Sequence, residues 1–81
     1  DQYSLAVLYQ EMLTGVLTFT GMTAARLATQ HLREAPDLSP LPQSQRPIIA
    51  RALSKDPARR FASCMELVRE LTAAATRSAV A

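Results

Sequence analysis

The stretch Asp1-Gln2-Tyr3-Ser4-Leu5-Ala6-Val7-Leu8-Tyr9-Gln10-Glu11-Met12-Leu13-Thr14-Gly15 decides the fold of this 81-residue chain. Asp1 stands where a helix N-cap is expected, and Gly15 stands where a left-handed glycine commonly ends a helix. With about 100° between successive residues, apolar side chains cover most of the helix circumference, and only Ser4 and Glu11 share a polar line. Such a helix is typically central, so we expect neighbours on several sides and no flank exposed to water.

Length and composition bound the class of protein. Eighty-one residues suffice for one small domain or for part of one. Apolar residues make up 48% of the chain while aromatic residues and glycine are few, which favours an Ala/Leu-rich helical protein over a sheet. The single Cys64 cannot form an internal disulfide, and nothing in the sequence indicates a metal site, a signal peptide or a membrane-spanning run. The chain starts at Asp1 without a methionine, so we expect it to be a fragment of a longer protein.

The second helix is expected to begin after the N-cap Thr23 and to run to about Glu34, because Ala35-Pro36 closes it. Apolar positions between these ends follow the three–four spacing of one buried face. That face consists of Ala24, Leu27, Ala28, His31 and Leu32. The polar residues expected to face away from the core are Arg26, Gln30 and Arg33. The apolar residues of the preceding loop that should pack against the first helix are Val16, Leu17 and Phe19.

Prolines separate the second helix from the third. Residues 37–42 are predicted to form an extended connector that Leu38 and Leu41 hold against the core. The third helix is expected to begin near Ser44, with Pro47 in its first turn, where a missing N–H costs little. Its buried stripe consists of Ile48, Ile49, Ala52 and Leu53.

The last part of the chain predicts a capped turn and a final helix. Asp56 caps a tight helical turn, and Ser63-Cys64-Met65-Glu66 is a capping box that opens a helix to about Ala74. The residues that this helix is expected to bury are Leu67, Val68 and Leu71. We therefore expect an all-α unit of four main helices over residues 1–76 and a flexible tail over residues 77–81.

Three segments carry a family resemblance. The opening stretch, the run Gln30-His31-Leu32-Arg33-Glu34 and the run Ala52-Leu53-Ser54-Lys55-Asp56-Pro57-Ala58-Arg59-Arg60-Phe61 resemble, in that order, the C-terminal lobe of bacterial serine/threonine protein kinases. The resemblance covers roughly residues 1 to 72, from the central helix of the lobe to its last helix. The sequence departs from the family pattern at Ala6, where Gly is common, and at Thr18, where Pro is common. The resemblance implies an incomplete C-terminal subdomain of the protein-kinase fold.

The same resemblance implies an enzyme as the parent protein. A serine/threonine protein kinase uses ATP and Mg²⁺ to transfer the γ-phosphoryl group to a protein hydroxyl. The glycine-rich loop and the His-Arg-Asp and Asp-Phe-Gly motifs of that reaction do not occur in this chain and would lie N-terminal to Asp1. We therefore expect the fragment alone to be inactive, without catalytic, cofactor-binding or metal-binding residues, and to act as scaffold and as part of the substrate platform.

The expected partners follow from that interpretation. They are the remainder of the kinase domain and a protein substrate, with no nucleic acid and no membrane segment in this piece. The expected location is the cytoplasm, whether or not the parent is anchored to a membrane by another segment.

Three residues are candidate site residues by resemblance. Asp1 resembles the aspartate that fixes the kinase catalytic loop on the central helix, besides serving as a helix cap. Arg60 is similar to the arginine that pairs with the glutamate of the Ala-Pro-Glu motif, so here we expect it unpaired or paired with another acid. Glu11 resembles a glutamate that meets an arginine of the substrate peptide in kinases with basic substrates. The alternative, which we favour, makes Glu11 a structural acid at the rim of a buried helix.

Two further features have mainly structural interpretations. His31 lies on an apolar face without a second ligand at metal-binding spacing, so we expect a core or interfacial histidine rather than a ligand or a base. Residues 44–62 hold five basic residues against Asp56 alone, within a net charge of only +2. This cluster leaves open a free-standing helical interaction module or a DNA-binding module, although no helix face concentrates the residues that read bases.

Overall fold

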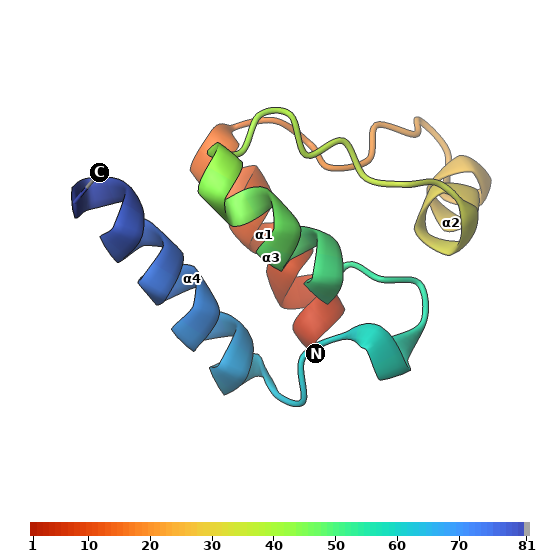
Figure 1. Ribbon diagram of the computed structural model, residues 1–81. Coiled ribbons are helices and arrows are strands. Elements are labelled where there is room, and N and C mark those ends of the chain that lie inside the picture. The colour runs from red at the N-terminus through yellow and green to blue at the C-terminus, as the bar shows by residue number, and fades with distance from the viewer. Residues whose placement is uncertain (81) are drawn as a thin grey trace.

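The computed structural model describes residues 1–80, with side chains described for residues 1–77. Its helices are α1 (Gln2–Thr14), α2 (Ala24–Arg33), α3 (Arg46–Ala52) and α4 (Cys64–Val80), and short 3-10 turns occupy Gln43–Gln45 and Pro57–Arg59. Residues 1–80 contain no strand. The predicted all-α fold with four main helices is confirmed (Figure 1).

The core lies between α1, α3 and α4, which contact one another pairwise (Figure 1). The buried residues of this core are Ala6, Leu41, Ile48, Ile49, Ala52, Leu53, Phe61, Leu67, Leu71 and Ala74. The predicted stripe of α3 is confirmed, and so is the role of Leu38 and Leu41, which hold the connector against the core. The prediction for Val68 is wrong, because positions 67, 71 and 74 share the inward face of α4 and leave Val68 43% exposed.

The predicted helix ends rest on local hydrogen bonds that the structure confirms. The Asp1 carboxylate accepts a hydrogen bond from the backbone N–H of Ser4 at 2.9 Å, and Gly15 ends α1 with a φ of 73°. The side chains of Thr23 and Asp56 cap α2 and the second 3-10 turn in the same way. These ends were predictable because a cap involves residues only two to four positions apart.

The capping box of α4 forms in part. Ser63 Oγ accepts a hydrogen bond from the Glu66 N–H at 3.1 Å, as predicted. The Glu66 carboxylate, however, accepts from the backbone N–H of Ala62 at 3.1 Å rather than from that of Ser63. The acid therefore satisfies a donor one residue further back along the chain than the motif predicts.

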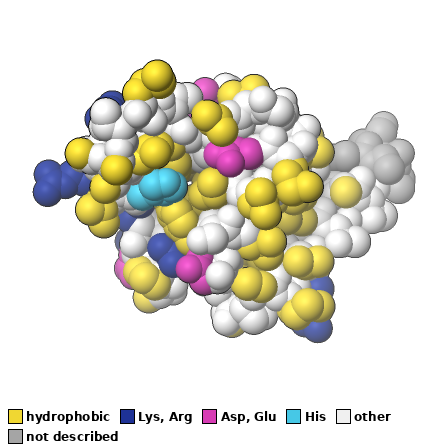
Figure 2. Space-filling model, turned by 180° about the vertical axis from the view of Figure 1, so that it is seen from behind, with side chains coloured by type: hydrophobic (Ala, Val, Ile, Leu, Met, Phe, Trp, Pro, Cys, Tyr) yellow, Lys and Arg dark blue, Asp and Glu magenta, His cyan; other side chains and the backbone are white. Residues whose placement is uncertain are grey.

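Helix α1 is not covered on all sides. Only Ala6 and Gln10 are fully buried in it, whereas an apolar flank lies 38–77% exposed. That flank consists of Leu5, Leu8, Met12 and Leu13. The prediction of a helix without an exposed flank is therefore wrong for this chain, because α3 and α4 cover one side only. Hydrophobic side chains are spread over the face seen in Figure 2, from behind the view of Figure 1.

The predicted buried face of α2 is confirmed at Leu27 and His31, which are half-buried, but it is wrong for its other three positions, which are exposed. Gln30 is buried, with its side-chain oxygen accepting from the Gly21 N–H at 2.8 Å, while Leu32 is 71% exposed. The reason is that α2 lies apart from the other helices and approaches them with the side that carries Gln30 and His31 (Figure 1). In the loop before α2, Phe19 is buried as expected, but Val16 and Leu17 are exposed.

The last helix is longer than predicted. It continues past Ala74 to Val80, because residues 73–79 contain alanines and no proline or glycine to stop a helix. The predicted flexibility of residues 77–81 stays a prediction, and Ala81 lies outside the described residues.

A reciprocal pair of hydrogen bonds closes the fold between its two ends. The Gln2 side-chain amide donates to the Phe61 carbonyl oxygen at 2.7 Å and accepts from the Phe61 N–H at 2.8 Å. This contact joins residues 59 positions apart and satisfies both backbone groups of a buried residue.

Removing this amide should therefore destabilise the fold. We expect Gln2→Ala to lower the free energy of unfolding by about 1–3 kcal/mol, because two partly buried backbone groups lose their partners. The matched control is Gln43→Ala at an exposed position, with an expected change within about 0.5 kcal/mol. Urea unfolding followed by circular dichroism measures both, and equal effects of the two substitutions would contradict the assignment.

Candidate functional site

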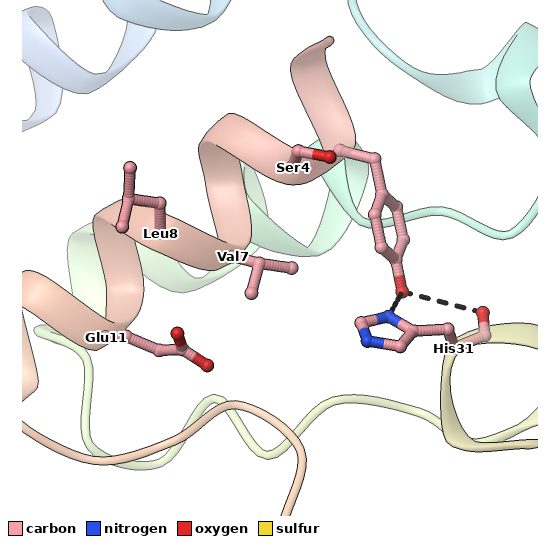
Figure 3. A pocket seen from close by; sticks show the side chains of 6 residues that line it. Ser4, Val7, Leu8, Glu11 and His31 are labelled. Atoms are coloured by element: carbon pink, nitrogen blue, oxygen red, sulfur yellow. Dashed lines mark hydrogen bonds between the residues drawn. The ribbon is translucent and has the colours of Figure 1, made fainter. Parts of the chain in front are cut away.

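A cleft of about 180 Å³ lies between α1 and α2 (Figure 3). Its lining residues are Tyr3, Ser4, Val7, Leu8, Glu11 and His31. All but His31 belong to α1, and they line the cleft together because positions 3, 4, 7, 8 and 11 lie on one face of that helix. The cleft thus has apolar walls with an acid toward one end and a histidine toward the other (Figure 3).

Glu11 has a structural partner at this cleft. One oxygen of its carboxylate accepts a hydrogen bond from the Thr18 N–H at 3.1 Å, which holds the loop after α1. The side chain is half-buried and lines the cleft, so the structural acid that we favoured is present. Its second predicted role, contact with a substrate peptide, stays a prediction.

His31 joins α2 to α1, as expected for an interfacial histidine. Its Nδ1 lies 2.9 Å from the Tyr3 hydroxyl, and its ring centre lies 4.6 Å from that of Phe19. Among the described residues, no group of three or more His, Cys, Asp or Glu side chains is placed to hold a metal ion. The ring therefore contributes contacts between helices.

Lys55 contacts three parts of the chain. Its ammonium donates to the Gln30 carbonyl oxygen at 3.1 Å and to the Tyr3 hydroxyl at 3.3 Å. It also lies 4.9 Å from the centre of the Phe19 ring, within the range of a cation–π contact. Loss of contact with water lowers the pKa of Lys55, and the like charge of Arg60 lowers it further.

Arg60 finds a backbone partner in place of an acid. Its Nε donates to the Ser54 carbonyl oxygen at 2.9 Å, and its guanidinium carbon lies 5.0 Å from the centre of the Tyr3 ring. Within residues 1–77, no carboxylate lies at ion-pair distance from Arg60. Burial raises the pKa of the Tyr3 phenol, and the nearby Arg60 charge partly offsets that rise.

Two other basic residues of segment 44–62 also bond to the chain itself. Arg46 donates to the carbonyl oxygens of Leu41 and Ser39 at 3.0 and 3.1 Å. Arg51 donates to the Arg59 carbonyl oxygen at 3.2 Å and stacks over a phenylalanine ring. Sequence reasoning missed these contacts, because a cluster of charges does not reveal which carbonyl groups the fold brings beside it.

The three predicted site residues do not gather at one place. Glu11 lines the cleft. Arg60 does not line it, but its guanidinium lies over the ring of Tyr3, which does. Asp1 caps α1 and is not among the lining residues. Sequence reasoning did not assign the contacts of Tyr3 and Lys55, and it expected His31 at an interface without naming its partners, although Tyr3 and His31 each stood at an apolar position of a predicted helix.

Comparison with known proteins identifies the family. No family model matches the chain. Serine/threonine-protein kinase drp72 of Corynebacterium efficiens is 47% identical over 75 residues, which cover 90% of this chain and 14% of that protein. Pkn3 of Myxococcus xanthus, also a serine/threonine-protein kinase, is 39% identical over 83 residues, with 90% of this chain and 15% of that protein covered. The chain belongs to the bacterial serine/threonine-protein kinase family.

The match to this family confirms the resemblance found in the sequence. PknB of Mycobacterium leprae, another serine/threonine-protein kinase, is 34% identical over 80 residues that make up 12% of its length. The chain thus spans between a tenth and a sixth of the length of these kinases, at 11–16%. Within residues 1–80, no helix combines the length and the apolar character that crossing a membrane requires.

The raised pKa of Tyr3 gives a spectroscopic prediction. In a Tyr9→Phe variant the remaining phenol belongs to Tyr3. The change in absorbance that marks its ionisation should have a midpoint above pH 10.0, the ordinary pKa of a tyrosine phenol, in the folded chain. The folded chain favours the neutral phenol over the phenolate. The contribution of the buried neutral Tyr3 to the free energy of unfolding is therefore present below pH 10.0 and is lost as the pH rises through the raised pKa. The same titration in urea is the control, and a folded midpoint at or below the unfolded one would contradict the burial of Tyr3.

Proposed function

We propose that this segment belongs to the catalytic domain of a kinase that transfers the ATP γ-phosphoryl group to serine or threonine hydroxyls of proteins. Within that domain, the segment forms scaffold and part of the surface that receives the substrate. The observation that carries the proposal is the similarity to serine/threonine-protein kinases, at 47% and 39% identity over 90% of this chain.

The flank of α1 supports a scaffold role because it needs a partner. Burial of apolar surface contributes about 25 cal/mol per Å², so four large exposed side chains on one helix represent several kcal/mol of unused stabilisation. The relatives are about six to nine times longer than this chain, which supports the remainder of the kinase domain as the partner. The opposite side of α1 is already occupied by α3 and α4.

The catalytic parts are assigned to the remainder of the domain. ATP and Mg²⁺ would bind there, since the described residues offer no cluster of acids that fits a metal ion and the sequence has no glycine-rich loop. The segment itself would be inactive, and it would lie in the cytoplasm.

The cleft supports a contact with a basic substrate side chain. Val7 and Leu8 provide apolar walls that suit the methylene stem of arginine or lysine, and the Glu11 carboxylate suits the charged end. The bond from the Thr18 N–H fixes the direction of that carboxylate before a peptide arrives. This arrangement makes Glu11 the residue of this segment that would contact the substrate.

Asp1 and Arg60 are proposed as supporting residues. Asp1 stands at the start of α1 and is exposed, so its carboxylate can accept further hydrogen bonds from a catalytic loop packed there. Arg60 uses its Nε for the Ser54 carbonyl group, and its terminal nitrogens have no hydrogen-bond partner among residues 1–77, which suits a bidentate bond to a glutamate of the parent domain.

DNA binding through segment 44–62 is the alternative function, and the contacts of that segment speak against it. The cations of Arg46, Arg51, Lys55 and Arg60 donate to backbone carbonyl oxygens of this chain. These bonds hold the cations against the chain, so phosphate binding would have to use the donors that they leave over, such as the terminal nitrogens of Arg60. A DNA affinity that falls steeply with salt would favour the alternative, whereas weak binding that is insensitive to salt would dismiss it.

The reading frame upstream of the Asp1 codon tests the proposal directly. We expect it to encode a glycine-rich loop, a phosphate-binding lysine, a catalytic aspartate and the residues that hold Mg²⁺. An upstream frame without a nucleotide-binding lobe would overturn the proposed function.

The proposed role of Glu11 is tested in the full-length kinase. Glu11→Gln keeps an acceptor for the Thr18 N–H but removes the charge, so KM for a peptide with an arginine near the acceptor serine should rise about tenfold. KM for the same peptide with alanine in place of arginine should stay the same. The matched control is Glu70→Gln, which removes an exposed acid on α4. An equal rise in KM for both peptides would show that Glu11 does not contact the basic side chain.

A further inference from the structure

Helix α2 is held to the rest of the molecule by little apolar burial. It lies apart from α1, α3 and α4 (Figure 1), and Gln30 is its only fully buried residue. Its Leu32 is exposed, and Leu27 is only half-buried. Because burial of apolar surface contributes little here, the position of α2 must depend on polar and aromatic contacts.

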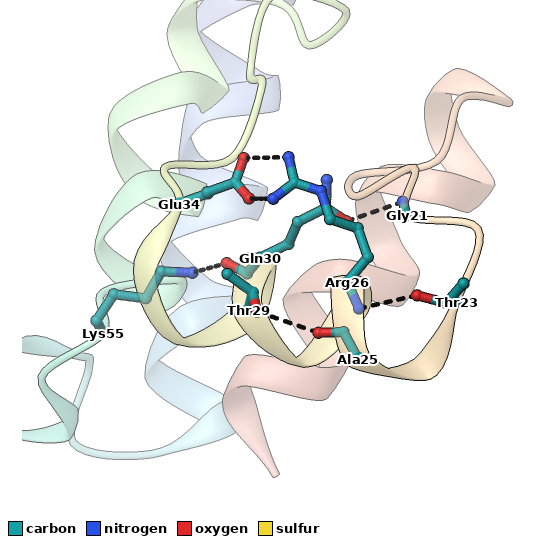
Figure 4. A network of polar contacts seen from close by, with 8 residues as sticks. All are labelled: Gly21, Thr23, Ala25, Arg26, Thr29, Gln30, Glu34 and Lys55. Atoms are coloured by element: carbon teal, nitrogen blue, oxygen red, sulfur yellow. Dashed lines mark hydrogen bonds and ion pairs between the residues drawn. The ribbon is translucent and has the colours of Figure 1, made fainter.

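Most of the polar contacts of α2 do not reach the three-helix core. The ion pair between Arg26 and Glu34 joins the two ends of α2 to each other at the surface, and Gln30 bonds to the preceding loop at Gly21 (Figure 4). An exposed ion pair of this kind contributes little to stability. Neither contact fixes where α2 lies relative to α1.

Two contacts among the described residues do reach across to the core. The first joins the Tyr3 hydroxyl of α1 to His31 at 2.9 Å. The second joins the Lys55 ammonium to the Gln30 carbonyl oxygen at 3.1 Å (Figure 4). Lys55 also donates to the Tyr3 hydroxyl, so this hydrogen bond links the two contacts to each other.

The surroundings of the Lys55 ammonium favour this bond. The Gln30 carbonyl group lies in the last turn of α2, where the helix dipole attracts a cation. The faces of the Phe19 and Tyr3 rings lie 4.9 and 5.6 Å from the nitrogen and add cation–π attraction. One ammonium group thus contacts α1, α2 and the loop between them.

We propose that Lys55 is a positioning residue for α2. Its ammonium group sets the place of α2 relative to α1, and thereby the width of the cleft that His31 helps to line. Without this group α2 moves as a unit, while α1, α3 and α4 stay packed. The role of the cleft as a substrate surface rests on the proposed function, whereas the position of α2 does not.

Hydrogen exchange of the whole 81-residue chain tests this role, with Lys55→Met as the variant. Methionine keeps the length of the stem and removes the charge and the donors. We expect the amides of α2 to exchange about tenfold faster than in the unsubstituted chain, because a hydrogen bond to a charged group is lost. The buried amides of α1, α3 and α4 should keep their rates within about twofold. The matched control is Arg59→Met, which removes an exposed cation from the adjacent turn and should change neither set.

A second measurement reads the cleft wall itself. The adjacent Phe19 ring should shift the resonances of the His31 ring protons, so in Lys55→Met these chemical shifts should move toward those of an unfolded chain. Lys55→Arg keeps a cation that can donate to the Gln30 carbonyl group, and it should restore most of both readouts. These readouts need no kinase activity, so their failure is distinct from failure of the proposed function.

Three outcomes would overturn the proposal. Equal exchange of α2 in Lys55→Met and Arg59→Met would show that the ammonium does not hold the helix. Faster exchange of all four helices in Lys55→Met would make Lys55 a support of the whole fold rather than a positioning residue. An unsubstituted chain whose α2 exchanges like an unfolded peptide would show that α2 has no fixed position to set.

Discussion

The structure depends on how the apolar surface of α1 is divided. Ala6 is small and fully buried, so the helices of the core pack closely against α1 on that side. On the other side, large apolar residues such as Met12 lie in water. A 13-residue helix with apolar residues almost all round has more surface to bury than two partner helices can cover. The exposed flank is therefore the part of α1 that is left for a partner to cover, and the proposed function assigns that cover to the remainder of a kinase domain.

Side chains that bond to backbone carbonyl groups supply much of the remaining order. Gln2 pairs with both backbone groups of Phe61, while Arg60 and Lys55 each donate to a carbonyl oxygen at the end of a helix or loop. A small chain buries a modest fraction of its surface, so such bonds carry more weight than in a large domain. They also explain why the basic segment before α4 is part of the fold and not a free positive patch.

The sequence allowed prediction of features that depend on near neighbours. The cap at Asp1 and the buried stripe of residues 48–53 follow from spacing within one turn or two, and the structure confirms both. The burial of Gln30 and the contacts of Lys55 could not be predicted, because they depend on where α2 lies relative to the core. The exposed flank of α1 was also missed, since the pattern predicts which surface needs covering but not whether the chain supplies the cover. For the candidate site, the motif pointed to Glu11, whereas its partner Thr18 came only from the structure.

The oxidation of Met12 tests the central claim most directly. Met12 is 77% exposed in this chain, and Met22, which is 95% exposed, provides an internal standard. Peptide mass spectrometry after mild peroxide treatment gives the ratio of the two oxidation rates in the 81-residue chain and in the full-length kinase. We expect the ratio of Met12 to Met22 to fall at least about tenfold in the full-length protein, because the remainder of the domain covers the flank of α1. An unchanged ratio would show that this flank stays in water and would contradict the account.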